Sequence, residues 1–319
     1  MRIVFMGSSE LSCRCLEALL GMAAGGEATL VGVVTQPDRP SGRGRASAPC
    51  PARRAAESAG LSVLTPDNVN AQEVVEHLAA LRPDAIAVAA YGQMLKESVL
   101  TLPPLGCVNV HASLLPRYRG AAPIQWAIAR GETETGVTTQ YMARRMDAGD
   151  IVLRRTEPIR SDDTGATLHD RLALLAADLL AETLNRIRLG TAPRTPQAEA
   201  EATYAPKLDR NDGKLDWTVA ARDLANRIRG FHPWPGCFCE APASRAENAS
   251  PLRLKVLQAA VEAGHGRCGE ILAVDEAGLL VATGGEALRL RRVQLEGKRA
   301  MSGADYARGH AVQAGVILR

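Results

Sequence analysis

Aromatic residues are scarce in this chain, since tryptophan, tyrosine and phenylalanine together make up 3% of its 319 residues. Single-stranded nucleic acids are commonly held on stacked aromatic side chains, so a general single-strand binder is disfavoured. The net charge is only +3, which argues against a protein whose whole surface attracts nucleic acid. Any contact with nucleic acid must therefore be local.

Long hydrophobic runs are also missing. No stretch of about 18 apolar residues occurs, as a membrane-spanning helix would need, and the N-terminus runs from Arg2 through an apolar segment to Gly7 without the pattern of a signal peptide. We expect a cytoplasmic protein that has no membrane partner and is a monomer.

The cysteines do not form the pattern of a disulfide framework. There are seven, an odd number scattered over a long chain, which indicates reduced thiols. Cys13 and Cys15, and again Cys237 and Cys239, form C-x-C pairs, whereas zinc ligands usually follow a C-x₂₋₄-C spacing. We expect these to be buried apolar side chains and expect no metal.

The first part of the chain alternates strand-like and helix-like segments. A length of 319 residues points to two domains. The predicted strands and helices cover 2–6, 10–23, 30–35, 52–59, 61–64, 69–81, 85–90 and 106–111. This alternation predicts a Rossmann-like α/β domain over 1–189, with a parallel sheet covered on both faces and ligands at the carboxyl ends of its strands.

A second domain follows a change in composition. A helical segment over 168–189 leads into a run rich in Pro, Ala and Glu, which we interpret as a linker over 190–207. After it, a short helix over 224–230 and strand-like runs at 252–257, 269–274, 279–283 and 287–293 alternate with turns. We expect a smaller β-barrel, OB-like, over 208–319.

Two polar side chains share one face of a predicted strand. Residues two apart in a strand point the same way, so Asn109 and His111 form a pair at the end of the apolar run 106–111. Taken alone, each is easily explained as a structural residue. The pair is more telling, because the strand ends where this sheet class binds its ligands.

A carboxylate can complete a catalytic set with Asn109 and His111. Asp147 and Asp150 both lie in a turn-like segment after the strand-like run 136–142, and the spacing does not choose between them. An amide, an imidazole and a carboxylate suit acyl transfer to an amine: Asn109 and a protonated His111 would donate to the oxyanion, and the carboxylate would orient His111 and accept the amine proton through water. Cys107 faces the same side in principle, but a thioester route lacks a second base.

Two longer segments of the sequence resemble those of a known family. Residues 109–123 read Asn-Val-His-Ala-Ser-Leu-Leu-Pro-Arg-Tyr-Arg-Gly-Ala-Ala-Pro, and 146–150 read Met-Asp-Ala-Gly-Asp. Together they resemble the signature of the folate-dependent formyltransferase family. The resemblance implies 10-formyltetrahydrofolate as co-substrate and Asn109, His111 and Asp147 as catalytic residues. It also implies that the folate site is lined by Ser113, Leu114, Leu115 and Pro116.

A basic segment and the second domain indicate which substrate accepts the formyl group. Residues 36–55 hold five arginines against the lone Asp38. The run 35–45 resembles the Arg/Gly-rich insertion of those members that formylate methionyl initiator tRNA for translation initiation, which implies that Arg39, Arg43 and Arg45 contact the tRNA, Arg43 most directly. The segments 203–208, 228–235 and 297–301 resemble the C-terminal half of the same members and imply a tRNA-binding second domain.

Two alternatives remain. Members of the family that formylate UDP-4-amino-4-deoxy-arabinose have a similar second domain, and the basic run 36–55 argues against them. A non-catalytic RNA-binding protein could use the same small barrel. The set of Asn109, His111 and Asp147 argues against an inert scaffold.

Overall fold

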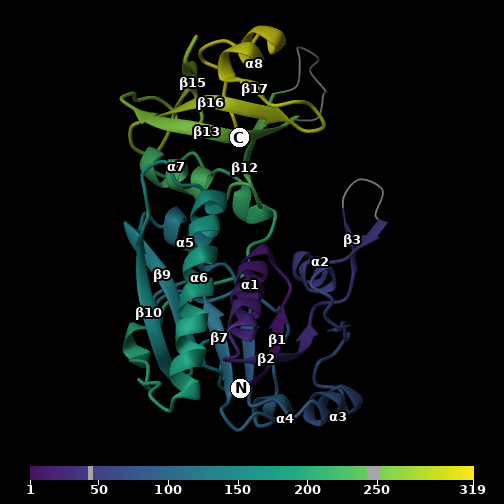
Figure 1. Ribbon diagram of the computed structural model, residues 1–319. Helices are drawn as coiled ribbons and strands as arrows, with labels where there is room; N and C mark the ends of the chain where they lie inside the picture. The colour runs from purple at the N-terminus through teal and green to yellow at the C-terminus, as the bar shows by residue number, and fades with distance from the viewer. Residues whose placement is uncertain (42–45, 243–251) are drawn as a thin grey trace. The chain divides into compact units, whose positions relative to one another are not determined.

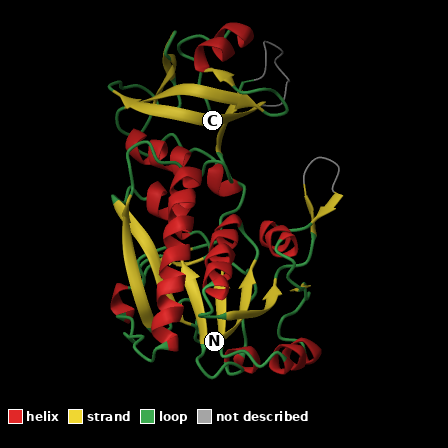
Figure 2. Ribbon diagram, viewed as in Figure 1, coloured by secondary structure: helices red, strands yellow, loops and turns green. Residues whose placement is uncertain are grey.

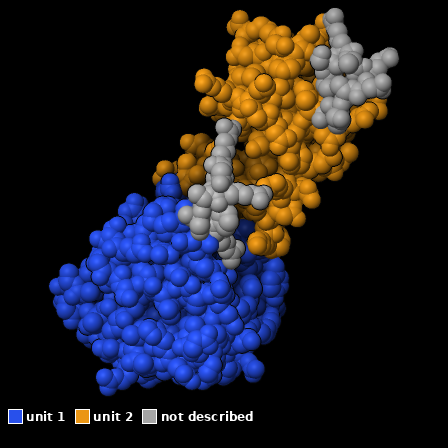
Figure 3. Space-filling view, turned by 90° about the vertical axis from the view of Figure 1, so that its right-hand side faces the viewer, with its two compact units in different colours: residues 1–123, 134–158, 169–205 blue, residues 124–133, 159–168, 206–319 orange. Residues whose placement is uncertain are grey.

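The computed structural model describes residues 1–41, 46–242 and 252–319, which divide into two compact units. Unit 1 holds residues 1–123, 134–158 and 169–205, and unit 2 holds 124–133, 159–168 and 206–319 (Figure 3). No helix among these residues is long and apolar enough to cross a membrane.

Unit 1 is built on a seven-stranded sheet (Figures 1 and 2). The strand order is β10-β9-β7-β6-β1-β2-β5. In chain order the strands are β1 (Arg2–Gly7), β2 (Thr29–Val34), β5 (Val63–Leu64), β6 (Ala85–Ala89), β7 (Cys107–His111), β9 (Glu134–Tyr141) and β10 (Ile151–Pro158). The helices are α1 (Glu10–Ala24), α2 (Pro51–Ser58), α3 (Gln72–Ala80), α4 (Glu97–Leu100) and the long α6 (Gly165–Arg188), whose residues from 169 belong to unit 1.

Both faces of the central strands are buried. Side chains alternate along β1, so Val4 and Met6 point to one face, where they pack with Val74 and Leu78 of α3. The helix α1 packs against β1, β2 and β6, and it begins at Ser9, whose side chain accepts a hydrogen bond from the Ser12 amide in a capping box. These buried strands explain the nearly unbroken apolar runs in the sequence.

The sheet is mixed. The strands β5, β2, β1, β6 and β7 run parallel, whereas β9 pairs antiparallel with β7, and β10 antiparallel with β9. A parallel pair needs a crossover of a dozen or more residues, and only the short turn between Tyr141 and Ile151 joins β9 to β10. The strand β10 was not recognised in the sequence because only Ile151 and Val152 of its eight residues are buried, so its apolar signal is weak.

Unit 2 is an antiparallel sheet with helices. The order is β12-β13-β16-β15-β14, with β17 paired to β16. The elements are α5 (Pro123–Ala129), η2 (Asn211–Gly213), α7 (Ala221–Gly230), β12 (Cys237–Ala241), β13 (Leu252–Glu262), β14 (Ile271–Asp275), β15 (Gly278–Ala282), β16 (Ala287–Leu295), β17 (Met301–Ser302) and α8 (Gly303–His310). The predicted fold class, an α/β domain followed by a smaller β domain, is confirmed.

The C-x-C pair at Cys237 and Cys239 lies on the buried strand β12. Burial raises the pKa of both thiols to about 12, so they remain protonated and pack as small apolar groups.

The segment after α6 folds back on unit 1. It contains the short 3₁₀ helix η1 (Glu199–Glu201) and the strand β11 (Tyr204–Ala205), which pairs with β8 (Arg119–Gly120). A β-bridge also joins Thr195 to Ile151 of β10. The residues interpreted from composition as a linker are therefore attached to the sheet that carries Asn109 and His111.

Candidate active site

Asn109 and His111 lie on β7, a central strand of unit 1. Asn109 pairs with Val88 of β6 on one side and with Gln140 of β9 on the other, and β7 ends at His111. The side chain of His111 is buried and that of Asn109 is half-buried. The strand prediction places both residues correctly at the carboxyl end of β7.

Asp147 lies next to His111. Its Oδ2 is 3.7 Å from His111 Nδ1, and the two side chains are 12% and 7% exposed. The backbone of Asp147 has a φ of +50°, a left-handed conformation that aspartate tolerates better than most residues. The carboxylate accepts hydrogen bonds from the Gly120 amide at 2.9 Å and from Gln140 Nε2 at 3.0 Å. Asp147, rather than Asp150, therefore faces the imidazole.

The hydrogen-bond partner of His111 shows which of its ring nitrogens carries a hydrogen. Nε2 lies 2.8 Å from the Tyr118 carbonyl oxygen, which can only accept, so Nε2 carries a hydrogen. Nδ1 is then the nitrogen that faces Asp147. Its distance of 3.7 Å is that of an ion pair and is longer than a hydrogen bond.

The side-chain amide of Asn109 is half-buried near the end of β7. Among the residues that the structure describes, no hydrogen bond to this side chain occurs. A half-buried amide without a partner is costly unless water or a ligand satisfies it. Beside the His111–Asp147 pair, it is a donor available to a carbonyl oxygen that gains charge during acyl transfer.

The segment 113–116, expected to line a folate site, is mostly turned into the protein. Ser113 is fully buried, and its hydroxyl donates to the Arg117 carbonyl at 2.6 Å. Leu115 and Pro116 are buried as well, whereas Leu114 is partly exposed. Leu114 is therefore the side chain of this segment that is available to a ligand.

Cys107 belongs to the hydrophobic core. It is 3% exposed, and its thiol donates to the carbonyl oxygens of Val99 and Leu100 at 3.7 and 3.8 Å. Burial raises its pKa to about 12, so the thiolate that a nucleophile requires is not formed near neutral pH. The thioester route has no support from this geometry.

Replacing Cys107 with alanine should leave kcat within about twofold of the parent and reduce the free energy of unfolding by about 1 kcal/mol, because only a small buried group is lost. Steady-state kinetics and chemical denaturation measure the two effects. A loss of kcat above about 100-fold in a well-folded variant would restore the cysteine as nucleophile.

Of the three arginines expected to contact tRNA, the structure describes only the backbone of Arg39. Arg39 begins the short strand β3 (Arg39–Ser41), which pairs with β4 (Ala46–Ala48). Arg43 and Arg45 lie outside the described residues. Nearby, Arg53 forms ion pairs with Asp38 at 2.9 Å and Glu57 at 2.7 Å, so its charge is already balanced within the protein.

Sequence reasoning missed the residues that surround Asp147. Gln140 lies opposite Asn109, but it gave little signal, because β9 is polar at most of its positions and one more polar residue does not stand out. Gln197 gave no signal, since it stands in the segment interpreted as a linker. Its amide nitrogen donates to the carbonyl oxygens of Asp147 and Gly149, both at 2.8 Å.

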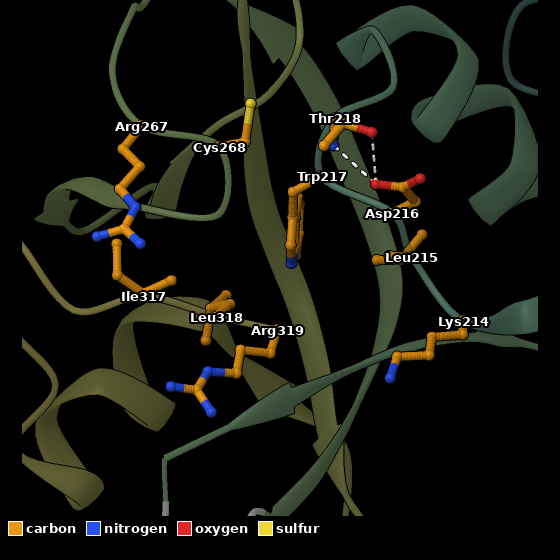
Figure 4. A pocket seen from close by; sticks show the side chains of 10 residues that line it. All are labelled: Lys214, Leu215, Asp216, Trp217, Thr218, Arg267, Cys268, Ile317, Leu318 and Arg319. Atoms are coloured by element: carbon orange, nitrogen blue, oxygen red, sulfur yellow. Dashed lines mark hydrogen bonds between the residues drawn. The ribbon is translucent and has the colours of Figure 1, made fainter.

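A separate hollow of about 560 Å³ lies in unit 2 (Figure 4). It is lined by Lys214, Leu215, Asp216, Trp217, Thr218, Arg267, Cys268, Ile317, Leu318 and Arg319. None of the residues predicted for catalysis or folate binding lies in it. Three of its ten lining residues are basic, and one of them, Lys214, is paired with Glu240 at 3.0 Å.

Comparison with known proteins decides the family. Residues 1–184 match the formyl transferase family, and residues 207–311 match the formyl transferase C-terminal domain. The chain belongs to the formyl transferase family. This confirms the resemblance noted in the sequence.

Close relatives within the family match the whole chain. A methionyl-tRNA formyltransferase of Geobacter metallireducens is 42% identical over 318 residues, covering 100% of this chain and 98% of the relative. Another, of Halothermothrix orenii, is 43% identical and covers 99% of each chain.

Solved structures share the fold at low identity. HypX from Aquifex aeolicus in complex with tetrahydrofolic acid has a TM-score of 0.62 at 19% identity, covering 96% of this chain and 47% of HypX. An N-formyltransferase from Helicobacter canadensis in complex with folinic acid and dTDP-3-aminofucose has a TM-score of 0.63 at 15% identity, covering 94% and 99%.

Proposed function

We propose that this chain transfers the formyl group of 10-formyltetrahydrofolate to the α-amino group of methionyl initiator tRNA. The observation that carries this proposal is the match at 42% identity to a methionyl-tRNA formyltransferase along its entire length, second domain included. The enzyme would act in the cytoplasm, where translation starts, and as a monomer, because unit 1 of one chain supplies every group of the candidate site.

The donor groups at the end of β7 fit a formyl carbonyl. The described residues make no hydrogen bond to the Asn109 amide, and His111 Nδ1 lies beside Asp147 at the carboxyl end of the same strand. Two such donors suit a carbonyl oxygen that gains negative charge, and no nucleophilic side chain is needed. Leu114, partly exposed in the segment 113–116, offers an apolar contact for the folate.

Asn109, His111 and Asp147 then divide the work of the transfer. The Asn109 amide donates to the carbonyl oxygen of the formyl group as the amine attacks. A proton on His111 Nδ1 adds a second, charge-assisted donor, and the Asp147 carboxylate stabilises that proton from 3.7 Å. The attacking nitrogen must lose a proton, and Asp147 accepts it through a water molecule. The bond from the formyl carbon to the folate nitrogen then breaks, and the proton returns through the same water to that nitrogen, so tetrahydrofolate leaves and the formyl group passes directly to the substrate nitrogen.

Purified enzyme offered 10-formyltetrahydrofolate with either methionyl-tRNA or UDP-4-amino-4-deoxy-arabinose tests the acceptor. We expect release of tetrahydrofolate only with the tRNA. Turnover only with the sugar nucleotide would assign the chain to the sugar-formylating members. Binding of tRNA without turnover of either acceptor would support the non-catalytic alternative.

Replacing Arg43 with alanine should raise the KM for methionyl-tRNA several-fold and leave kcat unchanged. The reason is the excess of arginine in residues 36–55: removing one phosphate contact should reduce the slope of log affinity against log salt by about 0.7–0.9. Kinetics at several salt concentrations measure both effects.

The matched control is Arg14→Ala, since Arg14 is exposed on α1 and pairs with Glu17 at 2.9 Å. It should change neither the KM nor the salt slope. Equal behaviour of the two variants would remove Arg43 from the tRNA interface.

A further inference from the structure

Two glutamine side chains connect the catalytic carboxylate to a buried arginine. We propose that Gln197, acting with Gln140, is a positioning residue that holds Asp147 against His111 for formyl transfer. The inference rests on the proposed function, because it assigns a role to the groups around its catalytic set.

The contacts form a continuous chain. Arg119 Nε and Nη2 donate to Gln197 Oε1 at 3.1 and 2.9 Å. Gln197 Nε2 lies 3.1 Å from Gln140 Oε1, and Gln140 Nε2 donates to Asp147 Oδ1 at 3.0 Å. Along this series the donors lie on the side of the guanidinium and the acceptors on the side of the carboxylate. Because the two hydrogens of Gln197 Nε2 also serve two backbone carbonyls, the contact with Gln140 is one branch of a shared hydrogen bond.

Chemistry fixes the direction of both amides. A guanidinium has only donors, so the atom of Gln197 that faces Arg119 must be its oxygen. An ionised carboxylate only accepts, so the atom of Gln140 that faces Asp147 must be its nitrogen. Neither side chain can turn over without losing bonds at both ends, and the network therefore has a single arrangement.

Gln197 also holds the main chain on both sides of Ala148. Its nitrogen donates to the carbonyl oxygens of Asp147 and Gly149, both at 2.8 Å. Asp147 has a φ of +50°, a conformation that costs energy and persists only where neighbours stabilise it. At Gly149 a Cβ would lie 1.7 Å from the Tyr141 carbonyl oxygen, so the turn packs directly on the end of β9.

The far end of the chain of contacts is firmly anchored. Arg119 is 1% exposed, and its Nη1 donates to the Glu199 carboxylate at 3.2 and 3.0 Å. Hydrogen bonds from Arg145 and Arg119 lower the pKa of Glu199, so the partner of the buried guanidinium stays ionised. A buried, paired arginine is costly to displace, and it therefore keeps Gln197 in place.

These bonds matter because Asp147 and His111 are held at 3.7 Å by charge alone, without a hydrogen bond between them. Without Gln197 the turn over 146–149 can relax and move the carboxylate away from the imidazole. A displacement of about 1 Å in an active site can cost about 100-fold in rate. The loss should fall on kcat, because the side chains of both glutamines are occupied by protein contacts around Asp147 and neither residue belongs to the proposed tRNA or folate contacts.

The experiment is a double-mutant cycle. Gln197→Met keeps the length of the side chain and removes its hydrogen bonds, and it should lower kcat roughly tenfold to 100-fold with both KM values unchanged. In an Asp147→Asn background the same change should alter kcat by less than about twofold, because the group that Gln197 positions has lost its role. The control is Glu201→Gln, an exposed residue of η1, which should change nothing.

An equal fall of kcat in both backgrounds would overturn the inference, because it would show a general structural role that does not act through Asp147. If Gln197→Met does not fold, Gln197→Glu replaces it in the cycle, since a carboxylate keeps Arg119 paired but cannot donate to the Asp147 and Gly149 carbonyls. If Asp147→Asn alone keeps full activity, the catalytic assignment fails. If Asp147→Asn lowers kcat but Gln197→Met does not, the positioning role of Gln197 is refuted and the catalytic role of Asp147 stands.

Discussion

Replacing His111 with alanine should lower kcat for formyl transfer by about 10²–10⁴-fold, the range that a positioned acid or base contributes. The dissociation constant for methionyl-tRNA should stay unchanged, because His111 is 6% exposed at the end of β7 and offers little surface to an RNA. Single-turnover formylation and equilibrium binding measure the two quantities separately.

Stability must be checked in the same variant. Removing the imidazole leaves the Tyr118 carbonyl without the donor that lies 2.8 Å away, at a cost of about 1–3 kcal/mol. His111→Gln is the sharper variant, since its amide nitrogen can reach the position of Nε2 and donate to Tyr118, but nothing replaces Nδ1. We expect this variant to be as inactive as His111→Ala and more stable.

The control for His111 is His77→Ala, because His77 is an exposed histidine on α3 of the same unit. It should retain full activity. A rate of formyl transfer that survives in His111→Ala would refute the assignment of the imidazole.

The sequence predicts best where one local pattern decides the outcome. The apolar runs of β1, β6 and β7 were located to within about two residues, because strands buried on both faces of a sheet read as nearly continuous apolar runs. The same period-two rule brings Asn109 and His111 to the end of β7 without any family knowledge.

The sequence does not predict contacts between residues that are far apart along the chain. The distance between Asp147 and His111 depends on how β9 pairs with β7, and strand pairing is not written in the spacing of the two residues. The family resemblance, not the residue pattern, favoured Asp147 over Asp150. The position of Gln197 depends on the segment after α6, which is attached to unit 1 by the pairing of β11 with β8. The composition of that segment, however, resembles that of a free linker.

Asn109 provides the most selective test of oxyanion stabilisation. Asn109→Ala should lower kcat by about 10²–10³-fold, the typical cost of removing one donor from an oxyanion site. The described residues make no hydrogen bond to this amide, so the free energy of unfolding should change by less than about 1 kcal/mol. Kinetics and chemical denaturation on the same preparation measure both effects.

Two further variants separate charge from shape. Asn109→Asp keeps the size of the side chain but places a negative charge beside the oxygen that becomes negative, so it should lower kcat at least as much as alanine does. Asn185→Ala, on α6, is the matched control and should keep full activity. If Asn109→Ala reduced stability substantially and kcat only slightly, Asn109 would be a structural residue of β7, and the oxyanion would be left to His111.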